Sequence, residues 1–490
     1  MDGIAESELK LKDPTLLAER SLVGGQWIDG DAGRTFTVTN PSNGMVIAEM
    51  ADLGEAETRR AIDAAYEAMP AWSAKLASER SAILMKWYEL MVENADDLAT
   101  ILTAEMGKPW PEARGEILYG ASFIQWFAEE GKRVYGDTIP AHKPNTRLVV
   151  IKQPVGVVGA ITPWNFPNAM IARKVAPALA VGCTMVAKPA KATPLSATAM
   201  AVLGERAGIP AGVFNVVCGS SSSAIGNELC RNDKVRKITF TGSTEVGRKL
   251  LEQCAHDIKK ASMELGGNAP FIVFDDADLD AAVEGAMVSK YRNAGQTCVC
   301  ANRIYVQSGV YDAFAEKLVA AVAKLKVGDG FEEGVTTGPL IDEAALAKVE
   351  EHVADATRLG AKVAYGGHAL GGTFYEPTVL TGVVQGMKVA REETFGPVAP
   401  LFRFDSEDEV IAWANDTEFG LACYFYSRDI GRVWRVAERL EYGIVGINDG
   451  LPSTTVAPFG GVKQSGLGRE GSKYGIDDYV EIKYLCMGGI

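Results

Sequence analysis

Short β-branched segments alternate with helical segments along the middle of this chain, and this alternation restricts the fold more than any other feature. Helices of ten to fifteen residues between strands provide the long crossover connections that parallel strands need. The pattern therefore predicts a doubly wound α/β domain. Its expected strands are 155–163, 184–188, 214–217 and 235–240, and its expected helices are 169–181, 197–207 and 244–256.

A second alternating series indicates a second α/β domain, with a boundary near Leu265–Gly267. At 490 residues, the chain is long enough for two or three domains. Residues 56–134 have helical apolar spacing. Two strand-like segments, 146–153 and 479–487, are expected to pair with each other, or with another subunit through an exposed edge. The second series comprises strands at 269–274 and 303–306, helices at 279–289 and 310–324, and units at 395–404, 406–415 and 443–448.

Composition excludes several functional classes. The formal net charge of -14 and the absence of a basic tract argue against a nucleic-acid partner. No apolar run reaches the roughly eighteen residues of a membrane span, and the N-terminal segment has no secretory pattern. The 8 cysteines and 4 histidines are scattered without C-x-x-C pairs, so we expect no metal site. We expect a cytoplasmic protein with reduced thiols.

Three motifs carry side chains with possible catalytic chemistry. Cys298 lies in NAGQTCVC, and alone it is as readily a buried structural thiol as a nucleophile. Glu264 follows an expected helix and precedes Gly-Gly, where desolvation would suit it as a general base, although a surface glutamate at a helix end is the ordinary alternative. Asn165 in TPWNFP follows an expected strand at the ligand-binding edge of the sheet, where a helix cap is the alternative.

Taken together, the motifs resemble those of the aldehyde dehydrogenase superfamily, from about residue 20 to the C-terminus. The resemblance implies a Rossmann-like cofactor domain (1–134 and 155–264), an α/β catalytic domain (265–465), and a β oligomerisation arm with a C-terminal strand (135–154 and 466–490). It also implies a homotetramer built as a dimer of dimers. The strings that carry it are PWNFP (163–167), KPA (188–190), FTGSTEVG (240–247), MELGGNAP (263–270), GQTC (295–298), EETFGPV (392–398), PFGG (458–461) and GVKQSGLGREGSKYG (461–475).

The resemblance assigns a role to each catalytic candidate in an NAD(P)-dependent aldehyde oxidation. Cys298 matches the nucleophile that adds to the aldehyde carbon. The Asn165 side chain and the Cys298 N–H match the donors that stabilise the oxyanion. Glu264 matches the base that activates water to hydrolyse the thioester. A catalytically silent binding homologue is the alternative from another class, and the presence of all three residues argues against it.

The cofactor preference depends on one position. Relatives that prefer NAD commonly carry a glutamate three residues after Lys188, whereas this chain has Lys191, whose ammonium attracts a 2′-phosphate. We therefore expect NADP to be preferred and NAD to be possible; a solvated surface lysine is the alternative. Ser243 is expected at a strand-to-helix turn that suits pyrophosphate. The full implied cofactor set is Thr162, Pro163, Trp164, Lys188, Ala190, Lys191, Gly242, Ser243, Val246, Leu265, Glu393 and Phe395.

The expected substrate carries its own carboxylate. Arg173, Arg292 and Ser453 match the carboxylate-binding set of the succinate-semialdehyde dehydrogenase branch, and Phe166 is expected beside them. Two buried guanidinium groups need an anion, although a structural ion pair is the alternative. Succinate semialdehyde is the first choice, and glutarate semialdehyde is the alternative because one methylene discriminates by only ~1–3 kcal/mol. A cationic betaine aldehyde would instead favour an aromatic cage.

Cys300 suggests a redox switch. If residues 298–300 are extended, Cys298 and Cys300 project to the same face. We therefore hypothesise a reversible disulfide between them that blocks activity under oxidation; a bystander thiol is the equally favoured alternative.

Overall fold

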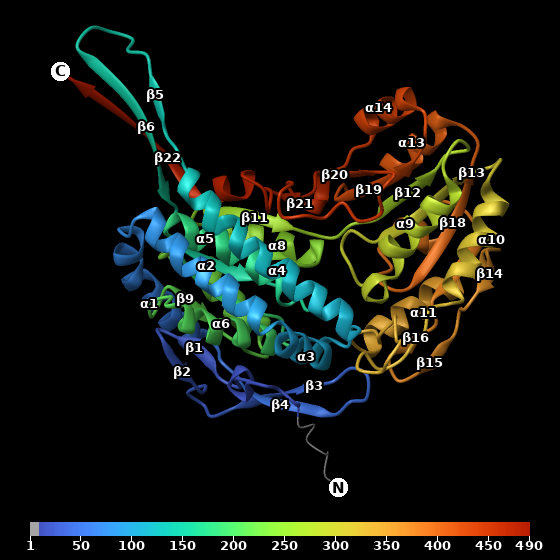
Figure 1. The fold of residues 1–490 in the computed structure, drawn as a ribbon, viewed down its shortest axis with the longest axis horizontal. Helices are drawn as coiled ribbons and strands as arrows, with labels where there is room; N and C mark the ends of the chain where they lie inside the picture. The colour runs from blue at the N-terminus through green and yellow to red at the C-terminus, as the bar shows by residue number, and fades with distance from the viewer. Residues whose placement is uncertain (1–8) are drawn as a thin grey trace.

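Two separate sheets form the two lobes of the molecule, and a slender arm projects from the larger lobe (Figure 1). The computed structural model describes residues 9–490. The first residues of the predicted 1–134 unit, and of the N-terminal segment without a secretory pattern, lie outside this range. Within residues 9–490, no helix combines the length and apolarity needed to cross a membrane.

The larger lobe contains an eight-stranded sheet in the order β2-β1-β9-β8-β7-β10-β11-β21. Its five inner strands, from β9 to β11, are parallel, and the chain reverses its direction of progress across the sheet between β7 and β10. Loops at such a switch point diverge and leave a crevice for a ligand. The strands are β1 (Ser21–Val23), β2 (Gln26–Ile28), β7 (Val157–Ile161), β8 (Thr184–Lys188), β9 (Phe214–Val216), β10 (Val235–Thr241), β11 (Lys260–Glu264) and β21 (Gly466–Leu467).

Helices cover both faces of this sheet, which confirms the predicted doubly wound arrangement (Figure 1). The expected helix 169–181 is observed with the same bounds as α5. All thirteen α5 residues are buried, because α4 covers one side of it and the sheet the other. The helices are α1 (Glu55–Ser73), α2 (Ala77–Glu93), α3 (Ala95–Met106), α4 (Trp110–Glu130), α5 (Ala169–Val181), α6 (Leu195–Ala207), α7 (Ser222–Arg231) and α8 (Thr244–Ala255).

The smaller lobe contains a seven-stranded sheet in the order β14-β17-β18-β13-β12-β19-β20, as the second alternating series predicts. The predicted division after residue 264 falls between β11 of one sheet and β12 of the other, and the detailed domain bounds stay a prediction. The strands are β12 (Ala269–Val273), β13 (Ala301–Gln307), β14 (Lys362–Tyr365), β17 (Thr378–Val383), β18 (Val398–Phe404), β19 (Ala422–Tyr426) and β20 (Ile444–Ile447). The helices are α9 (Leu279–Tyr291), α10 (Tyr311–Val322), α11 (Glu343–Arg358), α12 (Lys388–Arg391), α13 (Glu407–Asn415) and α14 (Ile430–Arg439).

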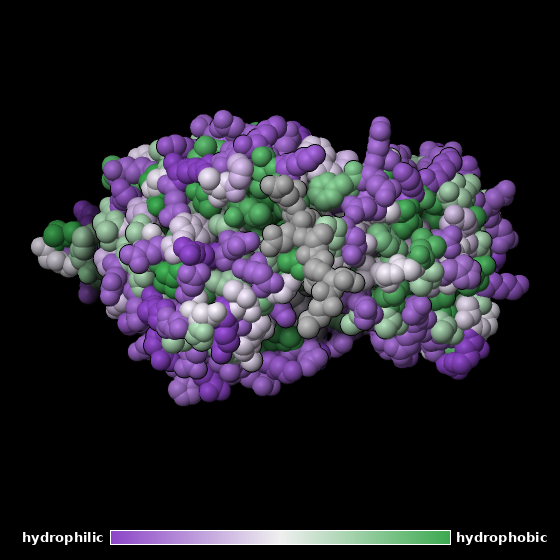
Figure 2. Space-filling model, turned by 90° about the horizontal axis from the view of Figure 1, so that it is seen from below, coloured by the Kyte–Doolittle hydropathy of each residue, from purple (hydrophilic) through white to green (hydrophobic). Residues whose placement is uncertain are grey.

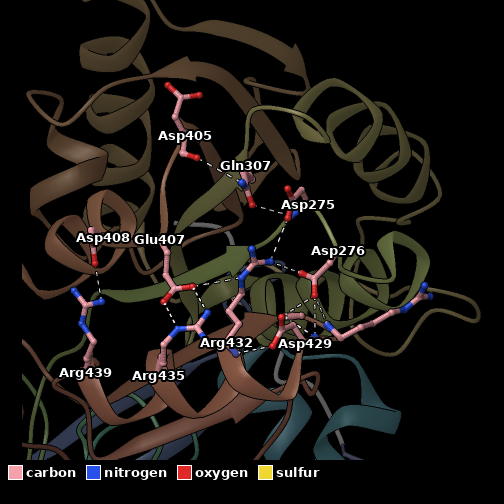
Figure 3. Close-up of polar contacts among 12 residues, drawn as sticks. Asp275, Asp276, Gln307, Asp405, Glu407, Asp408, Asp429, Arg432, Arg435 and Arg439 are labelled. Atoms are coloured by element: carbon pink, nitrogen blue, oxygen red, sulfur yellow. Dashed lines mark hydrogen bonds and ion pairs between the residues drawn. The ribbon is translucent and has the colours of Figure 1, made fainter.

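Ion pairs connect α14 to neighbouring elements of the smaller lobe (Figure 3). Val436 is the one α14 residue that is fully buried, so apolar packing alone holds this helix weakly. Arg432 pairs with Asp276 at 2.6 Å, and Arg435 pairs with Glu407 at 3.0 Å. These pairs join α14 to α13 and to the loop after β12, and none of their residues lines the cavities described below.

The arm consists of three antiparallel strands, β5 (Asp137–Ile139), β6 (Thr146–Pro154) and β22 (Val480–Gly488). β22 pairs with β6 along nine residues, which confirms the pairing expected between these two segments. Hydrophobic groups on the arm face solvent, as Figure 2 shows; Ile482 is 72% exposed and Tyr484 is 54% exposed. β21 was predicted as part of the arm, but it pairs with β11 in the larger lobe.

Candidate active site

The candidate site lies where the carboxyl ends of β7, β10 and β11 face the turn before β13. Asn165 follows β7, and Glu264 is the last residue of β11. Cys298 is in a turn that closes with a 3.1 Å hydrogen bond from the Cys300 N–H to the Thr297 carbonyl. The sheet of one lobe and a loop of the other therefore supply the three predicted catalytic residues.

The backbone before Cys298 is strained. Asn293 and Ala294 have φ angles of 53° and 55° in the left-handed region, which residues with a side chain rarely adopt. Glu112 of α4 accepts the Asn293 N–H at 2.9 Å and holds this conformation. Gly267 permits a further close approach, since a Cβ there would lie 2.6 Å from the Cys298 carbonyl oxygen. Strain of this kind is typical of functional loops, which the surrounding structure must hold in place.

Two cavities meet at Cys298, which lines both of them. One has a volume of about 320 Å³ and the other about 380 Å³. Among the predicted residues, the first is lined by Phe166, Arg173, Arg292 and Ser453, and the second by Pro163, Trp164, Asn165, Gly242, Ser243, Leu265, Glu393 and Phe395. The thiol is thus accessible to two different molecules from two sides.

The first cavity, which we call the anion cavity, contains polar groups without partners. Arg173 Nη2, Arg292 Nε and Ser453 Oγ are all buried, and none has a hydrogen-bond partner among the described residues. Burying such donors without an acceptor is costly. A ligand with a carboxylate would satisfy them.

Arg173 also has a structural partner in this cavity. Its Nε donates to Glu470, and the same carboxylate accepts from Lys174. Burial is the largest single influence and disfavours the Arg173 cation, but Glu470 together with the neighbouring Tyr119 and Glu264 opposes it, so the pKa of Arg173 is raised. The structural ion pair, which was the alternative to substrate binding for this arginine, is therefore present. It leaves one side of the Arg173 guanidinium facing the cavity.

Glu264 is 3% exposed and lies beside the Glu470 cluster, outside the lining of either cavity. Burial and the Glu470 carboxylate raise its pKa well above the usual value, although Arg173 opposes this. Its Oε2 has no partner among the described residues. The expectation that Glu264 follows a helix is wrong: β11 intervenes, and parallel pairing with β10 buries it despite its mixed sequence KASME.

Asn165 is held against the Cys298 loop. Its Nδ2 donates to the Gln296 carbonyl at 3.0 Å, and its second side-chain N–H remains for another acceptor. Asn165 is 4% exposed and lines the second cavity next to Cys298.

Burial favours the protonated form of the Cys298 thiol. Burial raises the pKa of Cys298 to about 12; the nearby Arg173 cation lowers it, and Glu264 raises it further. A thiol of this kind becomes a nucleophile only when a base removes its proton or a bound ligand changes its surroundings.

The second cavity is built for a flat group. Trp164 and Phe395 make an edge-to-face contact at 5.6 Å, and Phe395 has a φ of 55°. Glu393 accepts the Gly267 N–H at 3.2 Å, and burial raises its pKa to about 7. The Ser243 side chain caps the start of α8, where free N–H groups suit an anion.

The remaining predicted cofactor residues lie along the same edge, outside the cavity lining. Thr162 follows β7, and its N–H donates to the Lys188 carbonyl at 3.1 Å. Burial lowers the pKa of Lys188 to about 8, whereas Lys191 and the neighbouring Ala190 follow β8 at the surface edge. Val246 is in the first turn of α8 and is 42% exposed.

The geometric basis of the Cys300 hypothesis is wrong. Residues 297–300 form a turn instead of an extended segment, because left-handed residues precede them. Cys300 is 1% exposed, does not line either cavity, and accepts from the Lys290 ammonium at 3.3 Å. The disulfide itself stays a prediction that would require the turn to rearrange.

Several charged residues of the site were not predicted. Lys108, Glu112 and Glu116 line the anion cavity, and Lys348 lines the second cavity. Glu470 lies in the string GREGSKYG, which carried the resemblance, but nothing in that string indicates its partners. No sequence signal marks Glu116 in α4, because this helix carries other charged residues such as Glu112 and Arg114.

Comparison with known proteins identifies the class. The aldehyde dehydrogenase family model matches residues 27–485, and the chain belongs to this family. It is 66% identical over 484 residues to glutarate-semialdehyde dehydrogenase of Pseudomonas aeruginosa (98% of this chain, 100% of the relative). It is 65% identical over 482 residues to succinate-semialdehyde dehydrogenase [NADP(+)] of Escherichia coli (98% and 100%). A crystal structure described as an E. coli NADP dependent enzyme superposes with a TM-score of 0.97 at 65% identity (98% and 100%).

Proposed function

We propose that this enzyme oxidises succinate semialdehyde to succinate with NADP or NAD, and that glutarate semialdehyde is the alternative substrate. The observation that carries the proposal is the set of three unpartnered groups in the anion cavity, from Arg173, Arg292 and Ser453. The names of the two curated relatives support the same substrate class. A distal carboxylate bound by these groups would direct the aldehyde carbon towards Cys298.

In the proposed first half-reaction, the Cys298 thiol gives its proton to Glu264 or to a water molecule, and the sulfur then attacks the aldehyde carbon. The aldehyde oxygen becomes an oxyanion that accepts from the free Asn165 N–H and from the Cys298 backbone N–H. A nicotinamide dinucleotide, when bound, supplies the hydride acceptor. When the carbon–hydrogen bond of the adduct breaks and hydride leaves, the carbonyl re-forms and the substrate carbon is left as a thioester on Cys298.

In the proposed second half-reaction, Glu264 removes a proton from the water that attacks the thioester. The carbon–sulfur bond breaks, and the carboxylic acid and the thiol are released. Its raised pKa suits Glu264 to this role, because a more basic carboxylate accepts a proton from water more readily. The carboxyl group must turn towards the cavities from the position described above.

The residues of the second cavity fit a nicotinamide dinucleotide. Trp164 and Phe395 would enclose the flat ring, Glu393 would accept from ribose hydroxyls, and the capped start of α8 at Ser243 would hold the pyrophosphate. The buried Lys188, whose ammonium has one backbone acceptor, would bind the second ribose.

A steady-state comparison tests the substrate proposal. We expect kcat/KM for succinate semialdehyde to exceed that for butanal, an uncharged aldehyde of the same length, by about 10²–10³-fold, because only the former pairs with the arginines. Glutarate semialdehyde should lie within about tenfold to hundredfold of succinate semialdehyde. Equal values for the charged and uncharged aldehydes would contradict the proposal.

NADP preference is the finer proposal, and it depends on Lys191. Replacing Lys191 with glutamate should raise KM for NADP by about tenfold to hundredfold, because a charge-assisted hydrogen bond is lost and a repulsive charge is gained. KM for NAD should fall or stay constant. Lys324→Glu, a change of the same charge at an exposed position of the smaller lobe, is the control. An unchanged KM for NADP in Lys191→Glu would show that Lys191 is only a solvated lysine.

The exposed arm supports the homotetramer expected from the sequence. Ile482 and Tyr484 of β22 would be covered if the arm packed against another copy of the chain. The tetramer, and its construction as a dimer of dimers, stay predictions.

A further inference from the structure

Lys108 and Glu116 form a buried ion pair that the proposed mechanism does not use. The Lys108 ammonium donates to Glu116 Oε2 at 2.6 Å, and both side chains are 1% exposed. Lys108 lies between α3 and α4, and Glu116 lies in the second turn of α4. The pair lines the anion cavity next to Phe166.

The other contacts of this pair fall on one short segment, residues 165–169. The ammonium donates to the Asn165 carbonyl at 2.8 Å and lies 3.8 Å from the centre of the Phe166 ring. Glu116 Oε1 accepts the N–H groups of Asn168 at 3.0 Å and Ala169 at 3.2 Å. One ion pair thus holds the carbonyl at the start of the segment and the first N–H groups of α5 at its end.

The Asn165 carbonyl joins this pair to the nucleophile loop. It also accepts from Asn293 Nδ2 at 3.2 Å, and that same Nδ2 lies 3.2 Å from the Gln296 carbonyl. Gln296 in turn accepts from the Asn165 side chain. The position of the Asn165 amide relative to Cys298 is therefore fixed from two directions, by Lys108 and by the loop itself.

Stability alone is a poor explanation for the pair. Removing two charges from water is expensive, and well-packed apolar residues often replace a buried ion pair without loss of stability. What apolar residues cannot replace is the geometry: a donor aimed at the Asn165 carbonyl and an acceptor aimed at the start of α5. The same segment leads into Arg173, so both ends of the substrate depend on it.

We infer that Lys108 and Glu116 are positioning residues that set the Asn165 amide at the distance an oxyanion on Cys298 requires. The inference rests on the proposed function, because it concerns the oxyanion of that reaction. It makes both residues contributors to hydride transfer with every aldehyde, whether or not the aldehyde carries a carboxylate.

The double variant Lys108→Met/Glu116→Gln tests the inference. It removes both charges of the ion pair together, Arg292 remains as a cation near the buried Glu112, and the glutamine side chain keeps an oxygen for the α5 N–H groups, but nothing donates to the Asn165 carbonyl from this side. The rate of the first turnover, followed as reduced cofactor, should fall by about tenfold to hundredfold, since small misplacements of reacting groups cost this much. The factor should be equal for succinate semialdehyde and butanal. An unchanged rate, or a loss confined to the charged aldehyde, would overturn the inference.

A double-mutant cycle separates positioning from general loosening. Asn165→Ala alone should slow the first turnover by about 10²–10³-fold. In the Lys108→Met/Glu116→Gln background the same change should cost far less, because the donor is already misplaced. Losses that multiply fully would mean that the pair acts independently of Asn165, and the inference would be wrong.

Glu105→Gln is the matched control. Glu105 is another fully buried carboxylate that accepts two N–H groups at a helix start, those of Leu195 and Ser196, both at 2.8 Å. Loss of the Glu105 carboxylate should lower the melting temperature without slowing the first turnover. If Glu105→Gln slowed the first turnover as much as the Lys108→Met/Glu116→Gln variant does, the inference would be overturned. If the wild-type enzyme reduces no cofactor with any aldehyde, the proposed function fails; if it does and the cycle is multiplicative, only the positioning role fails.

Discussion

A Glu264→Gln enzyme mixed with succinate semialdehyde and oxidised cofactor should produce about one reduced cofactor per active site and then nearly stop. The steady-state rate should fall by about 10²–10⁴-fold, the usual contribution of a general base. The physical reason is that glutamine cannot accept a proton from water, whereas the thiol, the oxyanion donors and the hydride acceptor are unchanged. The acyl group would therefore accumulate on Cys298.

Rapid mixing with absorbance detection measures the burst, and intact-mass spectrometry should find one succinyl group on the protein. The burst rate also shows whether Glu264 deprotonates the Cys298 thiol. If it does, the burst in Glu264→Gln should be slower than in the wild type; otherwise the two burst rates should be equal. A variant that turns over repeatedly at the wild-type rate would show that another group activates the water.

The pH dependence of the wild type follows from the same residue. Burial raises the pKa of Glu264 well above its usual value, and only the ionised form accepts a proton. Thioester hydrolysis should therefore slow as the pH falls through this raised pKa and level off above it. In Glu264→Gln the residual hydrolysis should lose this dependence.

Arg292→Leu should separate charged from uncharged aldehydes. We expect kcat/KM for succinate semialdehyde to fall by about 10²–10³-fold, the effect of losing one partner of a buried charged hydrogen bond. The value for butanal should stay constant or rise, because the cavity becomes more apolar. Arg292 suits this test better than Arg173, whose loss would also leave Glu470 short of a partner.

Ser453→Ala is the companion variant, since it removes a neutral hydrogen bond from the same anion. Its loss should be about tenfold or less for succinate semialdehyde and absent for butanal. Equal losses for both aldehydes in Arg292→Leu would mean that the arginine supports the cavity wall instead of binding a carboxylate.

The fold was predictable where helices and strands have strong local patterns. The bounds expected for α5 and β8 match those observed, because each segment is apolar and ends at a glycine or proline turn. β11 was missed because KASME has no strand-like alternation; its burial comes from pairing with β10. β17 and β19 were also not predicted, although TVLTGV and ACYFY contain the β-branched and aromatic residues typical of strands.

The site was predictable where residue type and motif order were enough, and not where contacts join distant segments. Cys298 and Asn165 stand in motifs that resemble a known family, and the structure brings them to one place. Lys108 contacts a segment 57 residues away, and Glu470 contacts Arg173 across 297 residues. No periodicity in a single sequence links such positions, so the contacts of Lys108 and Glu470 can be recognised only in the structure.

Access to Cys298 from two cavities has a consequence for covalent inhibitors. An electrophile with a distal carboxylate would reach the sulfur through the anion cavity, while one attached to a flat aromatic scaffold would reach it beside Trp164 and Phe395. The two kinds of inhibitor would compete for the same sulfur atom, but the residues that bind each of them would line a different cavity. Selectivity among related dehydrogenases can therefore be tuned on one side without redesigning the other.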